Sequence, residues 1–160
     1  MNKKNMYRFL FSALFVCALT PAFSQFSLGA DVAFPSGDWS DYFGTGFGVS
    51  GRYEAAIQPK LNWTASIGFL SFSGKNSNTL TETVWPVTGG VKYYFQKSNG
   101  GVYGAADMGL FFGNNGAGTK FGFSPGIGYR LQKLDFAFRY NLVTDLSYWG
   151  LRVAYIFPGK

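Results

Sequence analysis

The 160-residue sequence contains no histidine and only one cysteine, Cys17. Histidine is the most frequent general base in enzymes, and histidine and cysteine are the usual zinc ligands. The acidic residues are scattered singly, so they do not replace these side chains as a metal site. We therefore expect no enzymatic activity, no metal site and no cofactor.

Charged residues are scarce as well, at 14% of the chain. The chain has 14 basic and 8 acidic residues, and three of the basic ones lie close to the N-terminus. The rest of the sequence is only weakly basic and lacks the clustered Lys and Arg residues of a nucleic-acid-binding surface. We expect no nucleic acid among its partners.

Long hydrophobic runs are also missing. The main uncharged apolar run, residues 9–19, is 11 residues long, whereas a transmembrane helix needs about 20. It follows the N-terminal basic residues and precedes the small residues Ala22 and Ser24. This arrangement is typical of a secretory signal peptide. We predict that residues 1–24 are a signal peptide, cleaved after Ser24.

The predicted mature chain, residues 25–160, is long enough for one domain and has no disulfide, because Cys17 is lost with the signal peptide. Aromatic residues are abundant at 20% of the sequence, with 18 Phe and 10 Tyr, and there are 22 Gly. A water-soluble domain of this size would not readily bury so many rings. The composition therefore favours a protein whose outer surface contacts lipid.

Large apolar side chains alternate with small or charged ones in eight short stretches of this domain. Alternation with a period of two predicts β-strands with two different faces. Longer polar loops alternate with tight turns between the stretches, as in outer-membrane barrels. The sequence predicts an all-β protein, an eight-stranded antiparallel up-and-down transmembrane β-barrel. The expected strands are 26–34, 43–57, 61–72, 84–95, 102–112, 119–131, 134–142 and 147–157.

The two faces of these strands differ in a way that favours an apolar exterior. One face is mostly Gly, Ala and Ser, which suits the crowded lumen of a narrow barrel. The apolar face carries no charge, and its rings form two bands, as expected for girdles at the membrane interfaces. A soluble, lipocalin-like barrel with the apolar face inward is the alternative. The expected girdle residues are Trp63, Phe95, Tyr129 and Phe157 near the turns and Phe47, Phe69, Trp85 and Trp149 near the loops.

On these features the sequence resembles the small eight-stranded outer-membrane barrels, the family of OmpX and the OmpA transmembrane domain. The most specific correspondence is in the last strand, where Gly150 is followed by Val153, Tyr155 and Phe157. In that family the barrel assembly machinery recognises such a strand, so the resemblance implies that these four residues form an assembly signal. Residues 158–160 after the last aromatic depart from the pattern. The resemblance also implies location in a Gram-negative cell outer membrane, with outer-membrane lipid as a partner.

Nine charged residues are expected to point into the lumen, four acids and five bases. Eight strands leave an interior that side chains just fill, and charges buried there are stable only when paired. We expect a salt-bridge network that plugs the barrel, and a gated ion path is the alternative. The expected network is Asp31, Arg52, Glu54, Lys92, Asp107, Arg130, Asp135, Arg139 and Arg152. The side chains expected to help fill the lumen are Leu70, Phe72, Tyr94, Phe111 and Ile156.

The turn between the sixth and seventh strands predicts a specific register. If Gln132 and Lys133 form a two-residue loop, Arg130 lies opposite Asp135 and both face the lumen. Gln-Lys lacks the Asn-Gly preference of a type I′ turn, but a register shifted by one residue would send one charge towards lipid. We therefore expect Arg130 and Asp135 to lie close enough to pair.

For function, we expect a non-enzymatic barrel that binds through its surface loops or serves as a scaffold or accessory subunit of a larger envelope complex. A narrow channel for small or apolar solutes, like the OmpW-type barrels, is the alternative. The group expected to be the best exposed contact site, or else a membrane-surface anchor, lies in the first loop: Asp38, Trp39, Asp41 and Tyr42.

Overall fold

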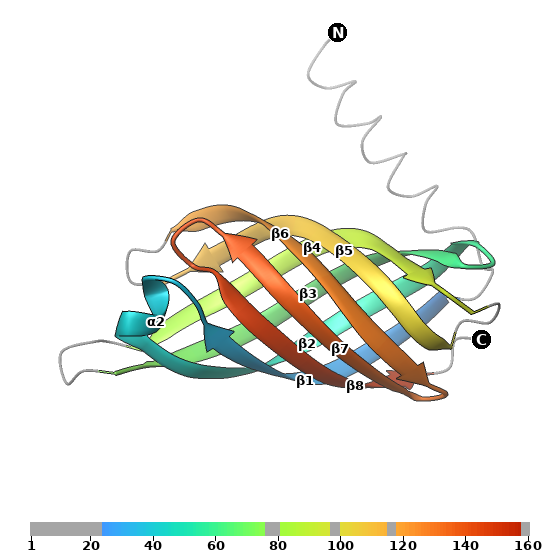
Figure 1. Ribbon diagram of the computed structural model, residues 1–160, viewed down its shortest axis with the longest axis horizontal. Helices are drawn as coiled ribbons and strands as arrows, with labels where there is room; N and C mark the ends of the chain where they lie inside the picture. Colours follow the sequence, from blue (N-terminus) through green and yellow to red (C-terminus); the bar gives the residue numbers. More distant parts are fainter. Residues whose placement is uncertain (1–23, 76–80, 97–99, 115–117, 158–160) are drawn as a thin grey trace, which may run out of the picture.

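A computed structural model describes residues 24–75, 81–96, 100–114 and 118–157. The predicted signal peptide, apart from Ser24, lies outside the described residues. The described part of the chain forms eight strands and one short helix (Figure 1). The elements in chain order are β1 (Ser24–Pro35), α2 (Trp39–Tyr42), β2 (Phe43–Gln58), β3 (Leu61–Gly74), β4 (Glu82–Tyr94), β5 (Gly101–Gly113), β6 (Thr119–Leu131), β7 (Leu134–Val143) and β8 (Tyr148–Phe157).

The strands form one closed barrel in which every strand pairs antiparallel with its sequence neighbours and β8 pairs with β1. The β1–β8 register runs without interruption from Phe26 opposite Phe157 to Pro35 opposite Tyr148. Closure leaves no free strand edge, so every strand has a hydrogen-bonded neighbour on both sides. The predicted eight-stranded antiparallel up-and-down barrel is confirmed. Among the described residues, no helix has the length and apolar character needed to cross a bilayer.

The observed strand ends lie within two residues of the expected ones. The main difference is in the first loop, where residues 39–42 form α2 at one end of the barrel (Figure 1). A four-residue helix is too short to show the helical period of 3.6 in a sequence pattern. We call this end, with α2 and the longer connections, the loop end, and the opposite end the turn end.

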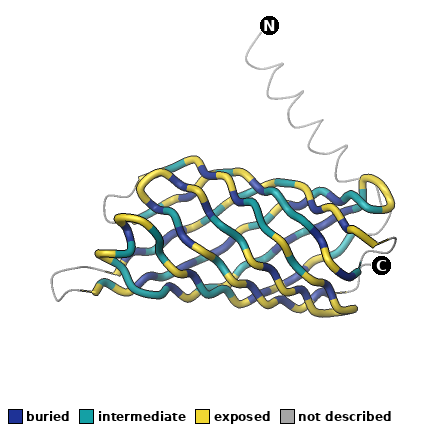
Figure 2. Tube along the Cα trace, viewed as in Figure 1, coloured by how far each residue is buried: buried dark blue, intermediate teal, exposed yellow. Residues whose placement is uncertain are grey.

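Burial alternates along most of the strands, so buried and exposed positions follow one another around the barrel (Figure 2). Phe121 and Ile127 of β6 are 62% and 63% exposed on the outer face, whereas Phe72 and Tyr94 are fully buried inside. The large apolar side chains therefore lie mainly outside. This arrangement contradicts the lipocalin-like alternative, which requires the apolar face to point inward.

The β6–β7 hairpin has the register that the sequence predicts. Leu131 pairs with Leu134 and Arg130 with Asp135, which leaves Gln132 and Lys133 as the loop. Gln132 has a φ of 40° and Lys133 has no positive φ, so the loop is not a type I′ turn, which needs a positive φ at both residues. The absence of Asn-Gly, the preferred type I′ sequence, therefore does not shift the register.

Glycines on the inner face leave room for charged side chains of the neighbouring strand. A Cβ at Gly90 would overlap the Asp107 carboxylate of β5, and one at Gly126 would overlap the Arg139 side chain of β7. Asp107 and Arg139 both belong to the predicted lumen network. Glycine at these positions is therefore one reason that the narrow lumen accommodates charge.

Val153, in the middle of β8, provides a test of the outer face. Its side chain is exposed, so an arginine there would lie against hydrocarbon near the bilayer midplane. We expect Val153→Arg to lower the free energy of unfolding by roughly 2–4 kcal/mol, measured by urea titration in lipid vesicles. Thr144→Arg, in the exposed β7–β8 loop, is the control and should cost less than about 0.5 kcal/mol. Equal losses would mean that the outer face does not contact lipid.

Candidate functional site

The lumen contains three layers of side chains, and the layer nearest the turn end is built around Lys92 of β4. Its ammonium lies 2.8 Å from Glu54 Oε2 and 2.8 Å from Asp135 Oδ2. The same ammonium lies 4.1 Å from the centre of the Tyr103 ring. One buried cation thus connects carboxylates from β2 and β7, two strands that are not neighbours in the sheet.

Neutral donors complete this first layer. Tyr94 Oη donates to Glu54 Oε1 over 2.7 Å, and Tyr103 Oη donates to Asp135 Oδ1 over 2.7 Å. Asn62 Nδ2 also donates to Glu54 Oε1, over 2.6 Å. The sequence places Tyr94 inside but gives no network role to Tyr103 or Asn62. The even spacing of Tyr103 from Asp107 on the weakly patterned β5 is the signal that identifies it as an inward residue.

Arg130 lies opposite Asp135, yet other groups satisfy its guanidinium. Arg130 Nη1 lies 3.2 Å from Tyr94 Oη and 3.7 Å from Glu54 Oε1, and Nη2 donates to the Gln25 side chain. Asp135 is bound instead by Lys92 and Tyr103 from other strands. The predicted register is therefore confirmed, while each charge of the predicted pair is bound by partners reaching across the lumen.

The second layer is built on Asp107 of β5, which is 1% exposed. Its Oδ2 lies 3.1 Å from Arg52 Nη2 and 2.9 Å from Arg139 Nη1. Its Oδ1 accepts a 2.8 Å hydrogen bond from Thr64 Oγ1. A single carboxylate therefore holds guanidinium groups from β2 and β7.

Arg152 of β8 and Asp31 of β1 are linked in this layer through Ser50. Arg152 Nε donates to Ser50 Oγ over 2.8 Å, and Ser50 Oγ donates to Asp31 Oδ2 over 2.5 Å. Arg152 Nη1 also lies 3.9 Å from Asp135 Oδ1, which connects the second layer to the first. The structure therefore places all nine charged residues of the predicted network on the inner face, although it brings them together in pairs that the sequence does not specify.

The third layer, at the loop end, is an apolar cap. The indole of Trp39 in α2 is centred 4.5 Å from the Phe72 ring, which lies 5.7 Å from the Tyr148 ring. Trp39 is only 8% exposed, so its predicted place in an exposed contact group is wrong. The indole turns into the barrel mouth because its large apolar surface is removed from water there. The cap consists of Ala33, Trp39, Leu70, Phe72, Val84, Phe111, Val143, Leu146 and Tyr148.

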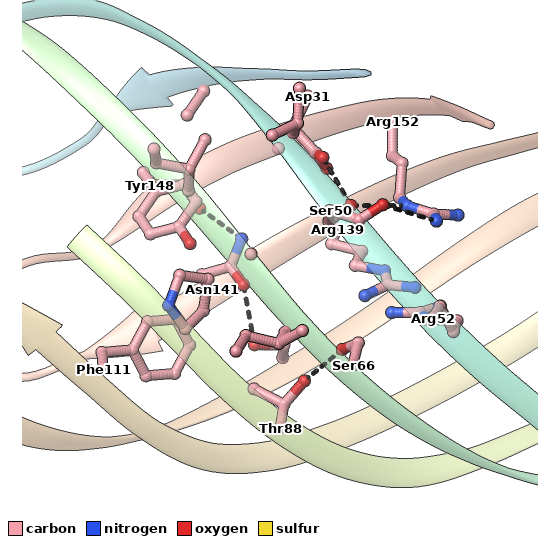
Figure 3. A pocket seen from close by; sticks show the side chains of 18 of the residues that line it. Asp31, Ser50, Arg52, Ser66, Thr88, Phe111, Arg139, Asn141, Tyr148 and Arg152 are labelled. Carbon is pink, nitrogen blue, oxygen red and sulfur yellow. Dashed lines mark hydrogen bonds between the residues drawn. The ribbon is translucent and has the colours of Figure 1, made fainter. Parts of the chain in front are cut away.

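A cavity of about 60 Å³ lies between the cap and the second layer (Figure 3). Leu70 and Phe111 of the cap form part of its wall, and Arg52, Arg139 and Arg152 form another part. A space of this size admits a small ion or a few water molecules. It does not extend the lumen into a pore.

A wider, open depression of about 390 Å³ lies at the loop end. Ser36 N donates to the Ser147 carbonyl over 2.9 Å, which ties two of the loops together beside it. Two exposed acids lie on its wall, and one of them, Asp145, pairs with Lys120 at 2.9 Å. The depression is lined by Ser36, Gly37, Asp38, Trp39, Tyr42, Tyr140, Asp145, Leu146 and Ser147.

Outward rings lie at both ends of the barrel, where the sequence predicts girdles. Six of the eight predicted girdle residues are exposed, and the other two, Trp63 and Phe69, are partly exposed. Phe69 lies 4.8 Å from the outward Trp85 ring, and Trp63 lies 5.2 Å from Tyr53. Their contact with the membrane interfaces stays a prediction.

The four predicted assembly residues lie on both faces of β8. Val153, Tyr155 and Phe157 are exposed on the outer face. Gly150 occupies an inward position, where an added Cβ would lie 3.3 Å from Asn141 Nδ2. Recognition of this strand by the assembly machinery stays a prediction.

Within the described residues, no group of three or more Asp, Glu, His or Cys side chains is arranged to hold a metal ion. The acids of the lumen network, Asp31, Glu54, Asp107 and Asp135, each face Lys, Arg, Tyr, Ser, Thr or Asn donors rather than one another. The chemistry that this arrangement supports is ion pairing inside the barrel and contact at its loop end.

A closed eight-stranded barrel with an apolar exterior and a charged, filled lumen defines the class of small transmembrane β-barrels. The sequence matches the family described as "Outer membrane protein beta-barrel domain" over residues 9–157. The chain belongs to this family, and its location is accordingly the outer membrane.

Solved structures share this fold. Ail, the attachment invasion locus protein of Yersinia pestis, superposes with a TM-score of 0.57 at 16% identity, over 84% of this chain and 97% of that chain. Neisserial surface protein A gives a TM-score of 0.57 at 18% identity, over 86% and 97%. A de novo designed transmembrane β-barrel gives 0.56 at 18% identity, over 83% and 95%. At these identities the likeness shows the fold alone. No curated protein matches the sequence.

Lys92 forms its ion pairs inside the lumen, whereas Lys120 forms one at the loop end. Substituting the two lysines therefore compares the stability contributed by a buried and by a more exposed ion pair. Lys92→Met leaves Glu54 and Asp135 buried without their shared cation, so we expect it to lower the free energy of unfolding by about 3–5 kcal/mol. Lys120 is 29% exposed and its partner Asp145 is 78% exposed, so Lys120→Met should cost at most about 1 kcal/mol. Urea titration in lipid vesicles measures both. A loss of under about 1 kcal/mol for Lys92→Met would contradict a stabilising lumen network.

Proposed function

We propose that this protein is a non-enzymatic outer-membrane barrel with a sealed lumen that acts through its loop end, as a binding protein or an accessory subunit of an envelope complex. The observation that carries the proposal is the filling of the lumen by two ion-paired layers and an apolar cap. A filled interior leaves the loop end as the aqueous surface on which side chains from several strands and α2 converge.

The alternative, a narrow channel for small or apolar solutes, needs a continuous path through the lumen. Phe72, Tyr94 and Tyr103 are fully buried on the inner face, at opposite ends of the barrel. Between these rings, Arg52, Lys92 and Asp107 are at most 2% exposed. This packing favours a plugged lumen over a solute path.

The loop end also supports the proposal that the protein is not an enzyme. Ser36 and Ser147 line the depression beside Asp145. A serine nucleophile needs an adjacent base, most often histidine, and the sequence has none. The exposed acids at this end are therefore better suited to binding than to catalysis.

For biogenesis, we propose cleavage after Ser24 and recognition of β8 by the barrel assembly machinery. Cleavage there makes Gln25 the first residue, and its side chain accepts a hydrogen bond from Arg130 inside the lumen. Val153, Tyr155 and Phe157 point outward on one face of β8, where an assembly factor or lipid has access to them.

The chemistry of the depression favours a positively charged partner. Asp38 supplies a carboxylate, and Asp145 supplies a second one that is paired with Lys120. Tyr42 and Tyr140 supply ring faces that attract cations. Ail has been solved in complex with the heparin analogue sucrose octasulfate, which is a polyanion. The acidic depression of the present chain has the opposite charge preference, so we propose a cationic segment of a partner protein as its ligand.

Two charge-matched substitutions in the first loop test this role. Asp38→Asn removes a carboxylate from the depression, and the Asp38 side chain makes no cap hydrogen bond to α2. Asp41→Asn removes the same charge from α2 at an exposed position outside the depression. Native complexes captured from detergent-solubilised envelopes should contain a partner with wild type and Asp41→Asn. With Asp38→Asn, recovery should fall roughly five-fold, equivalent to about 1 kcal/mol.

Equal recovery with all three proteins, or recovery of no partner by any of them, would contradict a binding role for this depression. Folding of each variant is checked beforehand by its change in gel mobility on boiling, which reports the closed barrel.

A further inference from the structure

Three guanidinium groups on the cavity wall have N–H groups with no protein acceptor. Arg52 is 2% exposed, yet its Nε and Nη1 have no hydrogen-bond partner among the described residues. In the same part of the chain, Nε and Nη2 of Arg139 lack a hydrogen-bond partner, and so does Nη1 of Arg152, which lies 3.9 Å from Asp135 Oδ1. All three side chains line the cavity beneath the cap, where Figure 3 shows their guanidinium groups gathered on one side.

Charge in this part of the lumen is not balanced. Arg52 and Arg139 share one carboxylate oxygen, Asp107 Oδ2, so a single negative charge serves two positive ones. Across the lumen network as a whole, five bases face four acids. Glu82 is also buried, but it lies opposite Phe72 at the loop-end start of β4, separated from the cavity by the cap. An uncompensated charge in a low-dielectric interior is costly.

Four neutral polar side chains on the cavity wall are already engaged with one another. Ser66 Oγ and Thr88 Oγ1 lie 2.7 Å apart in a hydrogen bond. Ser124 Oγ donates to Asn141 Oδ1 over 2.7 Å. Asp31, the acid on the wall, is bound by Ser50 beside Arg152. Among the described residues, the charged donors on the wall that remain free are the guanidinium N–H groups, and these recognise anions.

We propose that the cavity is a binding site for one small monovalent anion of the chloride type, held by Arg52, Arg139 and Arg152. Water would satisfy the free N–H groups but would leave the excess positive charge, whereas a monovalent anion satisfies both. The volume of about 60 Å³ admits a halide, with space for a water molecule beside it. It excludes a bulky organic anion such as gluconate. The site concerns the lumen and does not depend on what the loop end binds.

Unfolding rates in two salts test the proposal. Wild-type protein is refolded into lipid vesicles and unfolded with urea in equal concentrations of sodium chloride or sodium gluconate. An anion bound only by the folded barrel slows unfolding by the factor 1 + [anion]/Kd. Unfolding should therefore be about ten-fold slower in chloride at ten times the Kd, and the ratio should approach one as chloride is diluted.

Arg139→Gln and Lys120→Gln separate a lumen site from a general salt effect. Arg139→Gln removes a ligand and the excess charge, so its unfolding rate should be the same in the two salts. Lys120→Gln removes an exposed base at the loop end and should keep the full chloride dependence. Equal rates for wild type in the two salts, or a chloride effect that persists in Arg139→Gln, would overturn the proposal.

Anomalous scattering from wild-type crystals grown in bromide gives a direct second measurement, independent of whether a variant folds. We expect a bromide peak inside the barrel between the three guanidinium groups. A cavity density without anomalous signal would identify water there and would overturn the anion site.

Discussion

The need to satisfy every backbone N–H and C=O group away from water is the constraint on which the rest of this structure depends. Strands meet it in a bilayer only when the sheet closes on itself, and here the whole of β8 pairs with β1 from Phe26 to Pro35. Closure with eight strands fixes a narrow interior. The inner face must then combine glycines, which make room, with side chains that fill the space between the walls.

Filling the lumen with charge connects strands that the sheet itself does not join. Lys92 of β4 binds acids of β2 and β7, and Asp107 of β5 binds bases of the same two strands. Such buried pairs are expensive to desolvate, and removal of one partner leaves the other charge buried and uncompensated. Their structural consequence is that the barrel interior is occupied, and α2 with its buried Trp39 closes the mouth at the loop end.

The strands and their faces are predictable from the sequence because each lumen residue is followed by an outward one. This alternation of small or polar with large apolar side chains is visible in nearly every strand. The Gln132–Lys133 register is predictable because a shift would put Arg130 or Asp135 into lipid. The partners of Arg130 are not predictable, since Tyr94, Glu54 and Gln25 reach it from strands far apart in sequence. Trp39 lies among polar residues in the first loop, so the sequence suggests that it is exposed. Its contacts with the Phe72 and Tyr148 rings, which only the structure shows, place it in the mouth of the barrel.

The central claim is that the lumen is sealed, and single-channel recording in planar bilayers tests it most directly. The refolded wild-type barrel should insert without producing steady conductance steps, because the paired charges and the apolar cap leave no continuous aqueous path. Reproducible open steps whose size changes when Arg52 or Arg139 is neutralised would contradict the sealed lumen and establish an ion path through the barrel.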